Sequence, residues 1–164
     1  GLAFLPAHLH HVYRLSLSSA GALVMLFGLG GLIFALGSRV LVRRLGEVGL
    51  SRYGGTLMGL ALLVIAYSPH WWITLPACLC FGLGFYMLHN VLQTQATQMA
   101  PEDRSTALTL FASVLFLGQS LGVALLAWGL DAGLLHHHLA GIAVCIVWVG
   151  WWVARQSPQP SVRT

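Results

Sequence analysis

The sequence predicts an all-α membrane protein of about five transmembrane helices, and its composition is the first reason. Hydrophobic residues make up 57% of the 164 residues and charged residues only 7%, and the mean hydropathy is +0.81. Soluble domains carry about 25% charged residues. A surface with so few charges has to face lipid over much of its area, so the bilayer is the first expected partner.

The second reason is a series of long uncharged intervals. A helix that crosses a hydrocarbon core of about 30 Å needs roughly 20 apolar residues. Turn-forming residues separate the intervals at Ser68-Pro69, Ala100-Pro101 and Asp131-Ala132-Gly133. Pro101, followed by Glu102 and Asp103, suits the start of a helix. The expected spans are residues 16–37, 53–68, 71–93, 106–130 and 139–154.

The first residues of the chain favour the interpretation that it belongs to a longer protein. Residues 1–5 are apolar and end at Pro6, as the tail of another helix would, and no signal peptide precedes the first span. We therefore expect residues 1–164 to form a single transmembrane domain that belongs to a longer protein, either as a natural piece or as a trimmed product.

The arginines predict the orientation. Basic residues gather on the cytoplasmic side of membrane proteins. With the spans numbered in order, only Arg14 lies on one side, and the loops on the other side hold Arg39, Arg43, Arg44, Arg52, Arg104, Arg155 and Arg163. We expect that side, and the C-terminus with it, to be cytoplasmic. The arginines flank apolar runs and form no basic surface, which argues against nucleic-acid binding.

Small residues at a spacing of four predict close helix packing. Gly55-x-x-x-Gly59 and Gly118-x-x-x-Gly122 each place two glycines on one helix face, where backbones can approach. This spacing is common in membrane proteins with several helices and names no function.

Taken in order, several short motifs resemble the C-terminal half of a transporter of the major facilitator superfamily, of the bacterial drug or sugar efflux type. These motifs are Asn90-x-x-Gln93, Ala100-Pro101-Glu102-Asp103-Arg104, Gly118-x-x-x-Gly122 with Gly129, and the opening Leu5-Pro6-Ala7-His8-Leu9 followed by Leu15-Ser16-Leu17-Ser18 and Gly21. The loop from Gly37 to Glu47 departs from the family, because Arg43 stands where an acidic residue is usual.

The resemblance implies that the five spans are helices eight to twelve of that fold. It implies secondary active transport of a small-molecule substrate by alternating access, as proton-coupled efflux across a bacterial inner membrane. A missing N-terminal half of the same transporter would be the partner. No cofactor and no enzymatic activity are expected.

Polar residues within the spans are the candidate site, because lipid cannot satisfy them. Tyr86, Asn90 and Gln93 share one face of the third span, and they either line a central cavity or pack between helices. On the fourth span the candidates are Ser113 and Gln119, although a hydroxyl there can bond to its own backbone.

His89 is the one histidine at membrane depth, and it either relays a proton or packs at a helix interface. No metal site is expected, although a membrane metalloenzyme remains an alternative through the outer histidines: His8, His10, His11, His70, His136, His137 and His138. A noncatalytic five-helix scaffold is the other alternative.

Overall fold

The computed structural model describes the backbone of residues 17–131 and 133–157 and the side chains of residues 25–130 and 133–157. The expectations for residues 1–5, for Arg14 and Arg163, and for His8, His10 and His11 lie outside these ranges. The described chain is helical throughout apart from short connections, which confirms the all-α membrane class. Its four helices are α2 (Leu17–Tyr67), α3 (Trp71–Met99), α4 (Arg104–Asp131) and α5 (Leu135–Gln156).

Each helix is long and apolar enough to cross a membrane. In lipid a backbone has to satisfy its own hydrogen bonds, which an uninterrupted helix does. The breaks fall where the sequence predicts them, after Tyr67, Met99 and Asp131. Pro101 lies in a turn, so the expectation that it begins the next helix is wrong by a few residues.

Helix α4 begins at Arg104 because Asp103 caps it. One carboxylate oxygen of Asp103 accepts the backbone N–H of Thr106 at 3.1 Å and the Ser105 hydroxyl at 3.0 Å, and the other accepts the Thr106 hydroxyl at 2.7 Å. These bonds satisfy donors that a helix start leaves free. The same bonds, from the Thr106 hydroxyl first and then from the Thr106 N–H and the Ser105 hydroxyl, hold the Asp103 pKa below its ordinary value.

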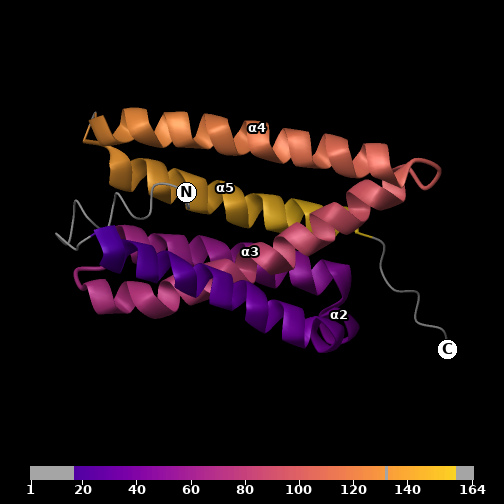
Figure 1. Ribbon diagram of the computed structural model, residues 1–164, viewed down its shortest axis with the longest axis horizontal. Coiled ribbons are helices and arrows are strands. Elements are labelled where there is room, and N and C mark those ends of the chain that lie inside the picture. The colour runs from indigo at the N-terminus through magenta and orange to yellow at the C-terminus, as the bar shows by residue number, and fades with distance from the viewer. Residues whose placement is uncertain (1–16, 132, 158–164) are drawn as a thin grey trace.

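Helix α2 contains the first two expected spans. The expected loop between them is corrected: residues 38–45 and 47–52 are helical, and only Gly46 departs from helical geometry, with φ 61° and ψ −176°. Leu41 and Leu45 hold this segment in place, because they pack against a buried cluster of Phe34, Leu50, Met87, Val91 and Val153. The chain turns back after the bend, so α2 forms two arms (Figure 1).

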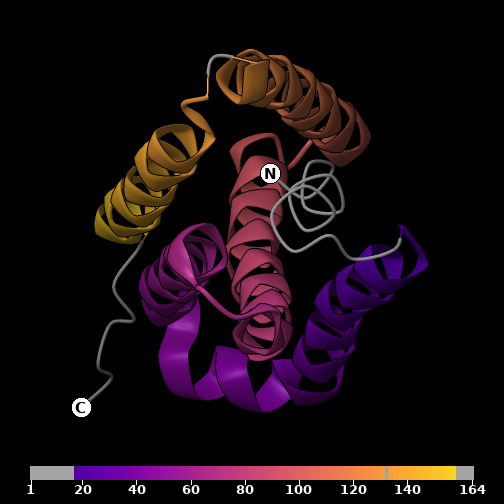
Figure 2. The same ribbon diagram turned by 90° about the vertical axis from the view of Figure 1, so that its left-hand side faces the viewer.

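Both arms of α2 pack against α3. A Cβ atom on Gly30, in the first arm, would lie 2.6 Å from the backbone nitrogen of Leu83. One on Gly84 would lie 2.7 Å from the carbonyl oxygen of Gly54, in the second arm. Figure 2 shows α3 near the centre, with α2 around it and α4 and α5 on the remaining sides. Helix α3 is therefore the axis of the bundle.

The Gly55-x-x-x-Gly59 motif packs as expected, and Gly118-x-x-x-Gly122 does not. Gly55 lies against Gly150 of α5, and Gly59 lies against Ala143 and Val147. No described atom lies within 4 Å of a Cβ atom built on Gly118 or Gly122. Among the described side chains of α4 only Leu126 and Gly129 are buried, so most of this helix has no protein against it.

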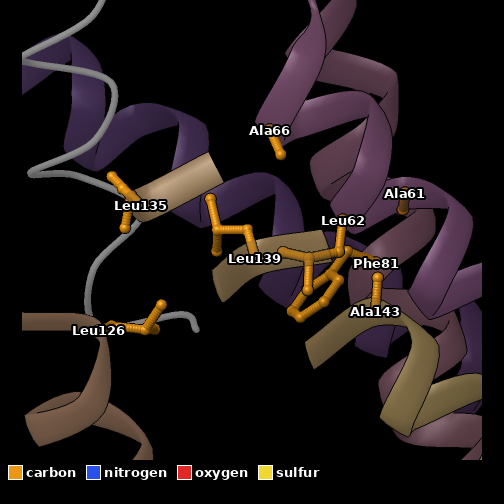
Figure 3. Close-up of a cluster of buried hydrophobic side chains, with 8 residues drawn as sticks. All are labelled: Ala61, Leu62, Ala66, Phe81, Leu126, Leu135, Leu139 and Ala143. Atoms are coloured by element: carbon orange, nitrogen blue, oxygen red, sulfur yellow. The ribbon is translucent and has the colours of Figure 1, made fainter. Parts of the chain in front are cut away.

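All four helices meet in one buried apolar cluster (Figure 3). Helix α2 supplies Ala61, Leu62 and Ala66, and the other helices supply Phe81, Leu126, Leu135, Leu139 and Ala143. Outside the cluster the surface is apolar as well: Leu36 is 81% exposed and Val114 is 70% exposed. Soluble monomers rarely expose apolar patches of such extent, whereas lipid covers them at no cost.

The described arginines gather at one end of the bundle. The bend in α2, the α3–α4 connection and the end of α5 lie together (Figure 1), and Gln95 donates a hydrogen bond to Ser157 there at 2.7 Å. At the opposite end the Tyr67 hydroxyl donates to the carbonyl oxygen of His136 at 3.4 Å. The helices alternate in direction, as the arginine pattern requires.

Candidate functional site

His89 lies between aromatic rings inside the bundle. Its ring stacks on Phe85, one turn earlier in α3, with centroids 5.3 Å apart and planes at 11°. Phe111 of α4 approaches it at 5.4 Å with a tilt of 46°. His89 is half-buried, so it links α3 to the sparsely packed α4 through ring contacts.

A pocket of about 300 Å³ opens beside this histidine. Helices α3 and α5 form most of its lining, and α2 and α4 contribute one residue each. Its lining is almost wholly apolar: Met58, Phe85, Leu88, His89, Leu92, Leu115, Ile142, Cys145, Ile146 and Val149. A pocket of this kind accepts an apolar group or an acyl chain, and it offers a polar ligand only the imidazole of His89 and the weakly polar thiol of Cys145.

Tyr86 lies at the contact between α2 and α3. Its ring packs so closely over Gly31 that a Cβ atom there would overlap it, and it lies 5.8 Å from the ring of Phe27. Tyr86 is half-buried and packs at the border of the buried cluster that contains Phe34. Its ring therefore acts first as a packing group between two helices.

Asn90 faces a different region, at the arginine-rich end. It is exposed and lines an open pocket of about 650 Å³ together with Ser38, Arg39, Val40, Val42, Arg43 and Arg44. Gln93 is half-buried and is not among the lining residues of this pocket or of the one beside His89. The three polar residues of the predicted stripe on α3 thus have three different surroundings.

Beyond the first turn of α4, its described hydroxyl groups donate to carbonyl oxygens of the same helix. Ser113 donates to the carbonyl oxygen of Thr109 at 2.9 Å, and Ser120 donates to that of Phe116 at 3.0 Å. Such bonds satisfy the donor at membrane depth without any ligand. Gln119 differs, because it is exposed and a whole amide cannot be satisfied by its own backbone.

Three of the four described histidines in the set of candidate metal ligands contact aromatic residues. His136 lies 5.9 Å from Tyr67, His138 lies edge-on to Trp128 at 5.5 Å, and His70 lies 5.7 Å from Trp72. Within the described ranges no group of three histidine, cysteine or acidic side chains is placed to hold a metal ion.

Two features of these sites escape sequence reasoning. One is the grouping of Asn90 with Arg39, Arg43 and Arg44, which are about fifty residues away in the chain. Nothing local signals it, because it depends on how α2 bends. The other is the contact of His89 with two aromatic rings. The four-residue spacing of Phe85 and His89 indicates the first contact, but nothing in the sequence indicates the contact with Phe111 of α4.

Comparison with known proteins gives one match. The family model described as Major Facilitator Superfamily matches residues 1–123, three quarters of the chain. No curated protein and no solved structure matches it.

Proposed function

Because the chain belongs to the major facilitator superfamily, a family of membrane transporters, we propose that it is the C-terminal half of a secondary transporter for a small molecule. The two halves of such a transporter rock against each other and expose a midplane site to each side in turn. We further propose proton-coupled efflux of a drug or sugar across a bacterial inner membrane, with the arginine-rich end and the C-terminus in the cytoplasm.

The exposure of α4 is the observation that supports this proposal best. This helix is long enough to cross a membrane, yet only Leu126 and Gly129 are buried among its described side chains. Gln119 projects from its exposed surface. A bare amide in hydrocarbon is unfavourable, whereas a water-filled cavity or a facing protein half would satisfy it. The surface of α4 around Gln119 therefore suits the wall of a transport cavity.

The remaining candidates have graded roles in this proposal. Gln119 presents an exposed amide that can hydrogen-bond a polar substrate. Asn90, which is exposed, and Gln93, which is half-buried, are amide candidates nearer the arginine-rich end of α3. Ser113 contributes an oxygen that can still accept a hydrogen bond while its proton is held by Thr109. Tyr86 supports the wall by packing. The acid that exchanges the coupled proton is assigned to the N-terminal half, because the described spans contain no acidic residue at their centres.

Transport into inverted membrane vesicles tests this function. Ethidium is the probe, and an imposed proton gradient is the driving force. We expect saturable uptake by the longer protein encoded when the reading frame is extended upstream, and none by residues 1–164 alone. Uptake by residues 1–164 alone would refute the assignment as half of a transporter.

A matched pair of variants tests the cavity wall separately. In the longer protein, Gln119→Leu is expected to lower kcat/KM for the transported probe roughly ten-fold, as for the loss of a buried hydrogen bond. Gln98→Leu removes another exposed amide near the end of α3, beyond the expected span, and should change kcat/KM little. Equal effects of the two substitutions would remove Gln119 from the cavity.

A further inference from the structure

The open pocket at the arginine-rich end is formed by one helical segment and one residue of α3. The segment comprises residues 38–45, just before the bend at Gly46, and α3 contributes Asn90. Ser38 is half-buried, whereas Arg39, Arg43, Arg44 and Asn90 are exposed. The pocket is therefore an open, basic hollow between the bend of α2 and the side of α3.

The lining of this pocket is basic. Three of the seven lining residues are arginines and none is acidic. Glu47 is the only acidic residue between Leu17 and Pro101, and it is half-buried, with one carboxylate oxygen inaccessible to solvent. Guanidinium groups hold phosphate oxygens through paired N–H donors, so this lining suits a phosphate or phosphodiester anion.

The segment packs against the protein through one face and presents both charged and apolar side chains on the rest of its surface. Leu41 and Leu45 pack against the buried cluster that contains Phe34, whereas the three arginines are exposed. Between the arginines, Val40 is 55% exposed and Val42 is 44% exposed. An apolar and a cationic surface side by side match the two parts of a lipid, an acyl chain and an anionic headgroup.

From this juxtaposition we propose that Arg39, Arg43 and Arg44, with Ser38 and Asn90, form a binding site for the headgroup of an anionic phospholipid. The phosphodiester lies among the guanidinium groups, Asn90 and Ser38 supply neutral hydrogen bonds, and Val40 and Val42 contact the upper part of an acyl chain. The site holds the bend of α2 at the membrane surface. This proposal is independent of the transport function, since a scaffold with the same bend would bind the same lipid.

Native mass spectrometry of the purified chain tests the site. The detergent-solubilised protein is mixed with equal amounts of palmitoyl-oleoyl phosphatidylglycerol and phosphatidylcholine, which share their acyl chains and differ in net charge. We expect the anionic lipid to be retained in preference by about ten-fold or more, as expected for several arginines facing one anionic group. No preference between the two lipids would overturn the proposal.

Substitutions of the arginines test whether the preference for the anionic lipid depends on this pocket. Arg39→Gln/Arg43→Gln/Arg44→Gln should reduce the preference to less than about two-fold, and Arg43→Gln alone should reduce it in part. Arg104→Gln is the matched control, because Arg104 is an exposed arginine of the same end that does not line the pocket. If the triple variant fails to fold, judged by circular dichroism, Arg43→Gln against Arg104→Gln decides. Full retention by Arg43→Gln, or equal loss in Arg104→Gln, would overturn the site.

A competition arm separates a lipid from a free anion. Inorganic phosphate is added in large excess over phosphatidylglycerol. We expect the lipid to remain bound, because the valines contribute contact that a free anion lacks. Displacement by phosphate alone would show an anion site in place of a lipid site and would overturn the proposal.

Discussion

Gly55 of α2 and Gly150 of α5 lie in backbone contact, although 95 positions separate them in the chain. A Cβ atom on Gly55 would lie 3.0 Å from the Cα atom of Gly150, and one on Gly150 would lie 2.7 Å from the carbonyl oxygen of Ser51. Neither neighbour is the flexible end of a side chain. The crossing of these two helices therefore depends on the absence of side chains at both positions.

Gly150→Ala is the sharpest test of this crossing. The added methyl group pushes the two backbones apart, and overpacking of this kind costs roughly 1–3 kcal/mol of folding free energy. Unfolding by sodium dodecyl sulfate, followed by circular dichroism in mixed micelles, measures the loss. Gly118→Ala is the control, because nothing described lies within 4 Å of its new methyl group. An equal response of the two variants would contradict the packing described.

The sequence predicts which glycines can pack but not which of them do. Gly55-x-x-x-Gly59 and Gly118-x-x-x-Gly122 are alike as patterns, yet only the first meets a partner among the described residues. The difference depends on how the helices are arranged, which the spacing of two residues does not encode. Span positions are predicted well for the opposite reason, since the lipid requirement acts on each helix separately.

Gly46→Ala tests the bend of α2. With φ at 61° and ψ at −176°, Gly46 adopts a backbone conformation that is essentially restricted to glycine. A side chain there costs about 1–3 kcal/mol. We expect a lower detergent-unfolding midpoint and a weaker reversal of the chain, seen as a longer distance between spin labels at Met25 and Tyr67. Gly28→Ala, within the first arm and with open space around it, should leave both quantities unchanged.

Asp103→Ala tests the cap of α4 through its pH dependence. The Asp103 pKa is lowered in the folded chain, mainly by the Thr106 hydroxyl and then by the Thr106 N–H. A lowered pKa means that the carboxylate stabilises the fold above its unfolded pKa, and that this contribution disappears as the pH falls through the folded value. The thermal midpoint of the variant should thus fall below that of the wild type near pH 7.

The difference in midpoint between the variant and the wild type should narrow as the pH falls through the lowered pKa that Asp103 has in the folded chain. Glu102→Ala is the control, because the neighbouring carboxylate caps no helix in the described chain. A difference for Asp103→Ala that stays constant with pH would show that the side chain acts by some means other than its charge.

Substitutions of Trp151 test the contact between α2 and α5 near the arginine-rich end. The Arg52 guanidinium lies 5.1 Å from the centroid of the Trp151 ring, and the indole N–H donates to the Thr56 hydroxyl at 3.2 Å. Trp151→Phe keeps an aromatic face and loses the hydrogen bond, whereas Trp151→Leu loses both. We expect the unfolding free energy to fall in that order, with about 0.5–1 kcal/mol for the cation–π contact.

Trp71→Leu serves as the control for this pair, since Trp71 is an exposed tryptophan at the opposite end of the bundle. If Trp151→Phe and Trp151→Leu lose equal stability, the hydrogen bond and the packing explain the contact, and the cation–π interaction contributes nothing measurable.

Residue type indicates polar candidates at membrane depth but not their partners. Tyr86, Asn90 and Gln93 form one stripe in sequence, yet Tyr86 packs on Gly31 and Asn90 faces arginines that a distant bend brings to it. A stripe predicts a shared helix face and nothing about what lies opposite. The hydroxyls of Thr109, Ser113 and Ser120 in α4 are the simpler case, because their partners are four residues away in the same helix.

Two substitutions of His89 distinguish a packing role of its ring from a role in proton transfer. Its stacking on Phe85 and its contact with Phe111 indicate that the ring fills space between α3 and α4. His89→Phe replaces the imidazole with a ring of similar width, so we expect an unchanged unfolding midpoint and unchanged proton-driven uptake in the longer protein. His89→Ala removes the ring and should cost roughly 1–3 kcal/mol, less than a fully buried aromatic residue would. If His89→Phe folds normally but abolishes uptake, the imidazole relays the proton and its role is chemical.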